Sequence, residues 1–253
     1  MSRPRVLTVA GIDPCGGAGL VVDVRVIDAC GGEPAAVPTC TTVQNRHGFR
    51  SARATPRAEF RAMLDAVVAD ALPSAVKLGM CVEPEKVVEF AAFWATLDAG
   101  LPLVVDPVGA ATAGGAPTRV ADVAAAIVAS LAPLGAILTP NLDELAGIGD
   151  PAALLAAGSR AVVVTGGHGP GDSIIDRLLL PQRAASIERP RIDRGPLHGT
   201  GCAFAAALAT RLAQGDGIEQ AFATSVDLVR GWIAATTAAR DGLPVPLRIA
   251  GEA

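Results

Sequence analysis

Residues 75–106 read AVKLGMCVEPEKVVEFAAFWATLDAGLPLVVD, and the rest of the fold prediction is built outward from this stretch. Two short apolar runs, at 75–80 and 103–105, flank a segment that begins at Glu83-Pro84 and ends at Gly100. Apolar residues recur within that segment at helical spacing, which predicts a helix. The flanking runs are almost unbroken, as is typical of parallel strands covered on both faces. Together they predict a β-α-β unit with a right-handed crossover.

The same pattern extends along most of the chain. Further apolar runs predict strands at 6–10, 35–40, 136–139 and 161–165. After Thr55-Pro56, an amphipathic helix is predicted from apolar residues at helical spacing, namely Phe60, Met63, Leu64, Val67 and Val68.

The last third of the chain predicts a different arrangement. Short apolar segments at 174–180 and 184–187 flank a polar turn and predict an antiparallel hairpin at the sheet edge. Two helices, at 201–213 and 218–235, follow, and the tail after Asp241 is expected to fray. The sequence therefore predicts one α/β domain over residues 1–253, a three-layer α/β/α sandwich with a mostly parallel central sheet and an antiparallel edge hairpin.

Composition excludes several classes of protein. Of 253 residues, 51% are hydrophobic and 18% are charged, which argues against disorder. Lys and Arg number 21 against 25 Asp and Glu, with no basic run, so no nucleic-acid partner is expected. Apolar stretches are interrupted before about 20 residues, and the N-terminus lacks a secretory signal, so we expect a cytoplasmic protein without membrane contact. Five dispersed cysteines indicate reduced thiols rather than disulfides or a zinc site.

Ligands of open α/β sheets lie beyond the carboxyl ends of the strands, so the segments that follow the strands are candidate sites. Residues 10–19 read AGIDPCGGAG, and the helix expected after them carries Asp23. Their glycines would let the backbone approach a ligand, but they equally suit a plain tight corner. The segment matches neither a Walker loop nor a clean dinucleotide fingerprint.

A second candidate site is the stretch 197–208, LHGTGCAFAAAL, in which a Gly-Thr-Gly turn opens an alanine-rich helix. Backbone N–H groups and the positive end of the helix dipole would attract a phosphoryl group there. Cys202 falls in the first turn, and this field predicts a lowered thiol pKa and a general-base role. The other four cysteines are expected to be inert.

A third candidate site is residues 139–144, TPNLDE, where Asn141 and Glu144 are spaced three apart at a helix start. An ordinary N-cap explains Asn141, and Glu144 also suits the first turn of a helix. At this sheet edge, however, such an acid could hold Mg²⁺ through water beside nucleotide phosphates.

Taken together, the chain resembles the hydroxymethylpyrimidine and phosphomethylpyrimidine kinases of thiamine biosynthesis, within the ribokinase-like superfamily. The matching blocks occur in order along most of the chain, at 10–19 with Asp23, 43–45, 77–80, 106–108, 139–142, 166–168 and 198–202. The resemblance implies a ribokinase-like fold and transfer of the γ-phosphate of ATP, with Mg²⁺, to a hydroxymethylpyrimidine or to its monophosphate.

Residue roles follow from the same resemblance. Cys202 matches the catalytic position, beside an anion hole formed by Gly199, Thr200 and Gly201. The residues implied to line the substrate pocket are Gly11, Ala18, Asp23, Gln44, Met80 and Val108. Those implied to contact ATP are Asn141, Thr165, Gly167 and Thr200, and those implied to hold the metal are Asp106 and Glu144. Gln44 suits an aminopyrimidine because its amide offers both a donor and an acceptor.

Two departures from the family pattern remove positive charge near the phosphates. Thr165 stands where the family usually has Lys, and Thr112-Ala113-Gly114 stands where it usually has Lys-Ser-Gly. Either slower turnover or a preference for the unphosphorylated substrate is expected, because a missing cation weakens binding of a doubly charged acceptor more than that of a neutral alcohol.

Two other functions stay open on the sequence alone. A pyridoxal-type kinase would share the superfamily and phosphorylate a similar aromatic alcohol. A catalytically weak pyrimidine-binding or regulatory protein would explain the two missing lysines. A homodimer is expected only because the family commonly forms one.

Overall fold

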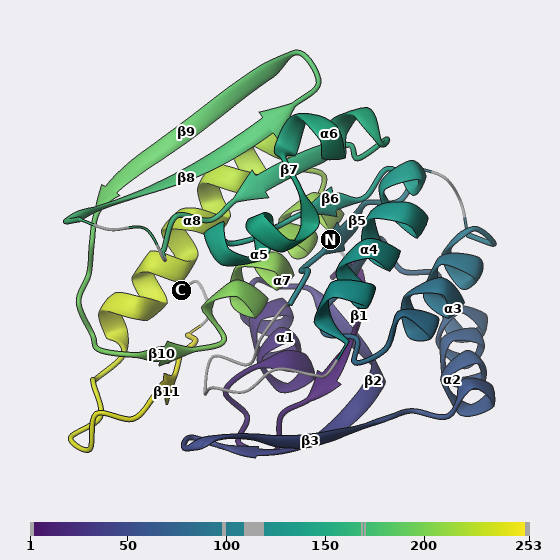
Figure 1. Cartoon of the computed structure of the whole chain (residues 1–253), viewed down its shortest axis with the longest axis horizontal. Helices are drawn as coiled ribbons and strands as arrows, with labels where there is room; N and C mark the ends of the chain where they lie inside the picture. The colour runs from purple at the N-terminus through teal and green to yellow at the C-terminus, as the bar shows by residue number, and fades with distance from the viewer. Residues whose placement is uncertain (1–2, 98–99, 109–118, 168, 170, 251–253) are drawn as a thin grey trace.

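The computed structural model describes residues 3–97, 100–108, 119–167, 169 and 171–250. Within them, nine strands form one sheet in the order β3-β2-β1-β4-β5-β6-β7-β8-β9 (Figure 1). The strands are β1 (Arg5–Ile12), β2 (Glu33–Asn45), β3 (Gly48–Ala54), β4 (Ala75–Leu78), β5 (Leu103–Val105), β6 (Ile137–Leu138), β7 (Ala161–Val164), β8 (Ser173–Leu180) and β9 (Arg183–Pro190). Strands β2 through β7 in this order are parallel, while β3, β8 and β9 pair antiparallel at the two edges.

Helices cover both faces of the sheet, which confirms the predicted three layers. One face carries α1 (Gly19–Ala29), α7 (Thr200–Ala213) and α8 (Ile218–Ala235). The other carries α2 (Arg57–Asp70), α3 (Pro84–Trp94), α4 (Val120–Ser130), α5 (Leu142–Ile148) and α6 (Pro151–Ala156). Successive strand residues point to opposite faces, so Leu103 and Val105 pack in one core and Val104 in the other. This is why the strands read as unbroken apolar runs.

The edge hairpin predicted near 174–187 is present as β8 and β9. A second hairpin, β2 with β3, was not predicted, because β3 has no buried residue and carries polar residues such as Arg50 and Arg53 instead of an apolar run. Among the described residues, no helix is both long and apolar enough to cross a membrane.

The prediction of a frayed tail after Asp241 is wrong. β11 (Val245–Pro246) pairs in parallel with β10 (Leu197–His198), and the side chain of Leu247 is buried. The tail follows α8 and returns to the segment that precedes the Gly-Thr-Gly turn. An apolar side chain and a short strand pairing therefore order residues that looked like an unstructured end.

Candidate active site

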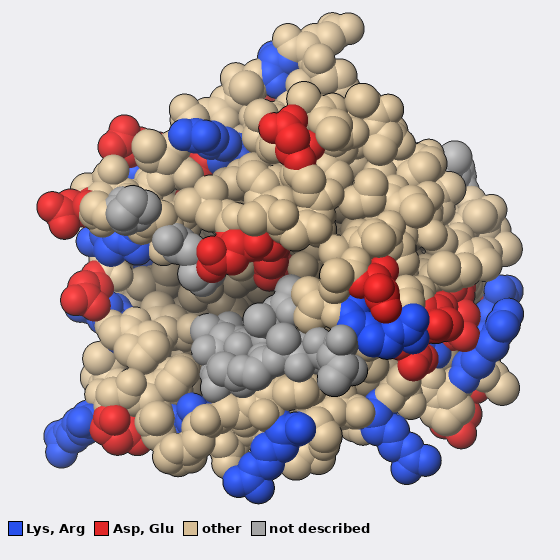
Figure 2. Space-filling view, viewed as in Figure 1, with Lys and Arg blue, Asp and Glu red and all other residues tan. Residues whose placement is uncertain are grey.

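A cavity of about 780 Å³ lies at the carboxyl ends of the parallel strands, within the range of roughly 300–1,000 Å³ usual for small-molecule sites. Figure 2 shows a hollow on this side of the molecule, with acidic side chains along its rim. Every predicted site residue except Asp23 lines the cavity. These are Gly11, Ala18, Gln44, Met80, Asp106, Val108, Asn141, Glu144, Thr165, Gly167, Gly199, Thr200, Gly201 and Cys202. Segments far apart in sequence are thus brought to one place.

α7 begins at Thr200, so the Gly-Thr-Gly turn opens the helix as predicted, and this turn lines the cavity. The first helical hydrogen bond runs from the Ala203 N–H to the Gly199 carbonyl, so the N–H groups of the preceding turn come before the helical ladder. Gly199 has φ +84°, and a Cβ there would lie 2.0 Å from the carbonyl oxygen of Gly17. Only glycine fits, and it brings the helix N-terminus directly against the glycine-rich loop.

Asp13 organises the glycine-rich loop, a role that the sequence did not reveal. Its carboxylate accepts hydrogen bonds from the backbone N–H groups of Cys15 at 2.9 Å, and of Gly17 and Ala18 at 3.1 Å. Its Oδ2 also lies 3.0 Å from Nε2 of His198. Although burial disfavours its charge, the hydrogen bonds of His198, Cys15 and the Gln44 side chain lower the pKa of Asp13 to about 2. The loop therefore folds around a carboxylate that is ionised at neutral pH.

Asp23 was predicted to line the substrate pocket, but the structure places it outside the cavity lining. It is fully buried, where its Oδ2 accepts from Thr8 Oγ1 at 2.6 Å and from Lys77 Nζ at 2.8 Å. Lys77 is also fully buried, and Gly79 leaves room for its ammonium, because a Cβ there would lie 2.6 Å from Nζ. A buried ammonium needs a counter-charge, and Asp23 supplies it.

Lys77 connects this buried pair to the cavity, since its Nζ lies 4.0 Å from Oδ2 of Asp106. Burial opposes the charge of Lys77, but Asp23, Cys202 and Asp106 outweigh it and raise the pKa of the ammonium. Burial raises the pKa of the Asp106 carboxyl, an effect that Lys77 opposes. The sequence does not reveal this role of Lys77, because no local pattern indicates where its side chain ends.

The predicted lowering of the Cys202 thiol pKa is wrong. Burial raises the pKa, the carboxylates of Asp106 and Asp23 act in the same direction, and Lys77 and a backbone hydrogen bond from Gly19 oppose them. The prediction considered only the helix dipole, which lowers a thiol pKa. Desolvation and the two nearby acids raise it, and their effect is larger. Cys202 therefore carries a neutral thiol that hydrogen-bonds with the Asp106 carboxylate.

Asn141 and Glu144 form a complete capping box at the start of α5. The Asn141 side chain accepts from the Asp143 and Glu144 N–H groups, and the Glu144 side chain accepts from the Asn141 N–H at 2.9 Å. Asn141 also forms an isolated parallel bridge with Thr165. The N-cap reading is confirmed, and the two side chains face the same cavity.

Two arginines line the cavity that also contains Thr165. The Arg191 guanidinium donates to the carbonyls of Gly167 at 2.8 Å, Gly169 at 2.5 Å and Gly171 at 2.9 Å. Arg191 and Arg230 both line the cavity. Neither was singled out, because no motif contains them. Thr112, Ala113, Gly114 and His168 lie outside the described residues.

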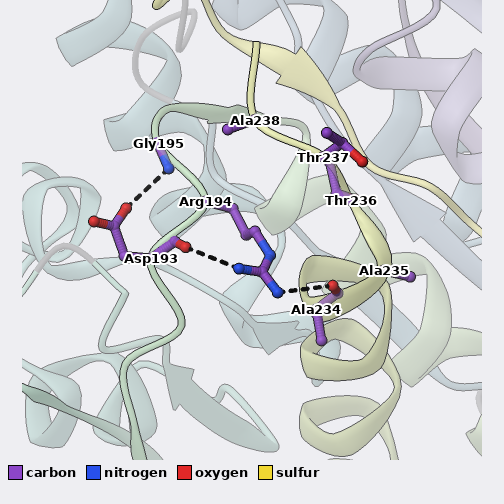
Figure 3. A pocket seen from close by; sticks show the side chains of 8 residues that line it. All are labelled: Asp193, Arg194, Gly195, Ala234, Ala235, Thr236, Thr237 and Ala238. Atoms are coloured by element: carbon purple, nitrogen blue, oxygen red, sulfur yellow. Dashed lines mark hydrogen bonds between the residues drawn. The ribbon is translucent and has the colours of Figure 1, made fainter. Parts of the chain in front are cut away.

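A second, shallower cavity of about 550 Å³ lies at the end of α8 (Figure 3). Arg194 donates there to the carbonyl of Ala234, in the last turn of α8, and to that of Asp193, whose side chain accepts from the Gly195 N–H. A cation at this end complements the helix dipole. These contacts hold the segment that leads into β10 and the Gly-Thr-Gly turn.

Comparison with known proteins identifies the family to which the chain is similar. A sequence model of the family described as phosphomethylpyrimidine kinase matches residues 13–245. A hydroxymethylpyrimidine/phosphomethylpyrimidine kinase of Streptomyces coelicolor is 36% identical over 93% of this chain and 90% of its own.

Solved structures share the fold. The phosphomethylpyrimidine kinase of Clostridium difficile 630 superimposes with a TM-score of 0.77 and 26% identity, over 92% of this chain and all of the other. The pyridoxal kinase of Staphylococcus aureus in complex with AMP-PCP and pyridoxal gives 0.83 at 23% identity, over 96% and 93%, and shows the fold alone. On the family match and the identity to its relatives, this chain belongs to the phosphomethylpyrimidine kinase family.

Proposed function

We propose that this chain transfers the γ-phosphate of ATP to hydroxymethylpyrimidine, to its monophosphate, or to both, in thiamine biosynthesis. The observation that carries the proposal is the packing of the α7 N-terminus against the glycine-rich loop, in one cavity with Gln44. An anion hole then lies beside a group able to recognise an aminopyrimidine. Family membership supports the same reaction.

The pyrimidine would lie among Gly11, Ala18, Gln44, Met80 and Val108. Gln44 is near enough to Asp13 that its side chain helps to lower the pKa of the Asp13 carboxyl. Its amide carbonyl would accept from the exocyclic amine of the pyrimidine, and an amide N–H would donate to a ring nitrogen.

In the reaction, the acceptor oxygen bonds to the γ-phosphorus while the bond from that phosphorus to the β–γ bridging oxygen breaks, and ADP leaves. The N–H groups at 200–202 would stabilise the charge on the phosphoryl oxygens. When the acceptor is the alcohol, its proton must leave, and Cys202 is the proposed acceptor of that proton. Only the thiolate can accept that proton, so this role depends on the minor thiolate fraction of Cys202. Phosphoryl transfer itself depends mainly on positioning.

The donor groups fit a bound cation. Asp106 is 3% exposed, and its Oδ2 has no hydrogen-bond partner in the described structure. Mg²⁺ usually keeps several waters and binds through few carboxylates, so an acid of this kind suits it. Asp106 and Glu144 would hold the metal, which would neutralise phosphate charge. Asn141, Thr165, Gly167 and Thr200 would contact ATP.

The test is ATP-dependent phosphorylation of hydroxymethylpyrimidine, its monophosphate and pyridoxal, followed by mass spectrometry. Phosphate gain on either pyrimidine, lost in a folded Cys202→Ala variant, supports the proposal. Turnover of pyridoxal alone would assign the other kinase activity, and binding without phosphate transfer would assign a binding protein. Equal activity in Cys202→Ala would remove the proton-accepting role of Cys202 only.

Three further features remain predictions. The family resemblance implies a homodimer, which light scattering on the purified chain measures. The chain is expected to act as a single domain, which one cooperative unfolding transition would support. A cytoplasmic location is expected from the sequence and can be tested by cell fractionation.

A further inference from the structure

Arg46 lies at the tip of the β2–β3 hairpin and forms hydrogen bonds with the C-terminal segment, at residues 241–244. Its Nε donates to the Pro244 carbonyl at 2.8 Å, and its Nη2 contacts Asp241 Oδ1 at 2.8 Å and the Leu243 carbonyl at 3.3 Å. Figure 1 shows the tip of this hairpin beside the C-terminal segment, near β11. We call residues 241–250 the C-terminal strap.

Further hydrogen bonds hold the rest of the C-terminal strap in place. The Val245 N–H donates to the Pro196 carbonyl at 3.1 Å, next to the pairing of β11 with β10. Beyond it, Trp232 Nε1 donates to the Ala250 carbonyl at 3.0 Å, and the Arg248 N–H donates to Thr236 Oγ1 at 2.9 Å. The strap therefore joins the hairpin tip to β10 and to the end of α8.

Both attachment points adjoin the site. Gln44 is two residues before Arg46, and the anion hole starts at Gly199, directly after β10. We propose that Arg46 is a positioning residue, which acts through the C-terminal strap to hold the Gln44 hairpin in register with the anion hole. This inference rests on the proposed function of Gln44 and of the N–H groups at 200–202.

The chemistry of Arg46 favours positioning over stability. The Arg46 and Asp241 side chains are 37% and 51% exposed, so their ion pair contributes little to the free energy of unfolding. The planar guanidinium, however, reaches a carboxylate and two carbonyls from one fixed plane. Lysine is a flexible point charge and does not reproduce that geometry. Loss of Arg46 should therefore change alignment more than it changes stability.

The experiment compares Arg46→Ala with Arg50→Ala, an exposed arginine on the neighbouring strand of the same hairpin. For Arg46→Ala we expect KM for the pyrimidine to rise and kcat to fall, together lowering kcat/KM by roughly tenfold, because small misplacements of reacting groups are costly. KM for ATP and the melting temperature should stay near those of the unmodified chain. Arg46→Lys should recover only part of the loss, and Arg50→Ala should show none.

A second measurement does not depend on catalysis. In Arg46→Ala, amide hydrogen exchange should accelerate both at 43–48 and at 197–201, while Arg50→Ala leaves 197–201 unchanged. If the chain lacks kinase activity, this measurement still tests the coupling by itself. Unchanged exchange at 197–201 in Arg46→Ala would overturn the inference. A lower melting temperature with unchanged kinetics would overturn it as well, since Arg46 would then be merely structural.

Discussion

Asp13 and His198 are 185 residues apart in sequence, yet Oδ2 of one lies 3.0 Å from Nε2 of the other. The imidazole packs against Gly17, where a Cβ would come within 2.5 Å of the His198 Cδ2. The Gly17 carbonyl in turn lies so close to Gly199 that a Cβ at Gly199 would come within 2.0 Å of its oxygen. The glycine-rich loop and the start of α7 are therefore one packed unit, held by the Asp13 carboxylate.

Asp13→Asn should loosen that unit. The amide keeps the size of the carboxylate but loses its charge and one acceptor oxygen, so a backbone N–H or His198 loses its partner. We expect about 1–3 kcal/mol lower free energy of unfolding, measured by urea denaturation at pH 7, and a lower kcat/KM for the pyrimidine. A variant as stable and as active as the unmodified chain would contradict this role.

The acid range gives an independent check on Asp13. Its folded pKa, about 2, is below the usual value near 3.9, so the stability that it contributes is fully present above about pH 4. That contribution disappears as the pH falls through about 2. Between pH 5 and pH 2, the free energy of unfolding should therefore decrease more steeply in the unmodified chain than in Asp13→Asn. If the two proteins lost stability equally over this range, the pKa of Asp13 would be the same in the folded and the unfolded chain, which would contradict the prediction.

Local patterns predicted most of the fold, and the failures have physical causes. Buried parallel strands such as β4 and β5 read as apolar runs because both of their faces are covered. β3 carries no such run because it is an exposed edge strand. The tail was missed because its order depends on Leu247 entering a core formed by elements distant in sequence. Only the tertiary structure brings those elements together.

In the site, too, the local backbone features could be predicted from the sequence and the tertiary ones could not. The backbone features of the loops were readable from glycine and helix-start patterns, and the structure places them in one cavity. The pKa of the Cys202 thiol could not be predicted from the sequence, because it depends on Asp106, Lys77 and Asp23, which come from three other segments. Asp23 was assigned to the pocket from a motif, yet its side chain points to a buried ammonium.

Gly199→Ala should abolish activity and destabilise the chain. An alanine there needs φ +84° and a Cβ placed 2.0 Å from the Gly17 carbonyl oxygen, and backbone strain alone costs about 1–3 kcal/mol. Gly217→Ala is the matched control, since Gly217 also caps a helix N-terminus but has φ −64° and open space around it. The control should lose at most about 1 kcal/mol, from N-cap preference, and keep its activity. Equal losses in both variants would show that close packing at Gly199 is unimportant.

Lys77→Met should destabilise the chain by about 3–5 kcal/mol, because it leaves Asp23 buried without its counter-charge. Asp23→Asn combined with Lys77→Met removes both charges, so most of the stability should return. Urea denaturation of the two single variants and the double variant measures the coupling between them. A double variant whose loss equals the sum of the single losses would show that the two side chains do not stabilise each other.

The rate of phosphoryl transfer to the alcohol should rise with pH if Cys202 accepts the substrate proton. Burial and the nearby carboxylates raise the thiol pKa, so only a small fraction is thiolate at pH 7, and that fraction grows about tenfold per pH unit. We expect kcat to climb steadily from pH 7 to pH 9, measured with saturating ATP and alcohol. Cys202→Asp is the control, because a carboxylate is already ionised over most of this range and its profile should be flatter. A flat profile in the unmodified chain would mean that the proton leaves by another route, with Cys202 only positioning the hydroxyl.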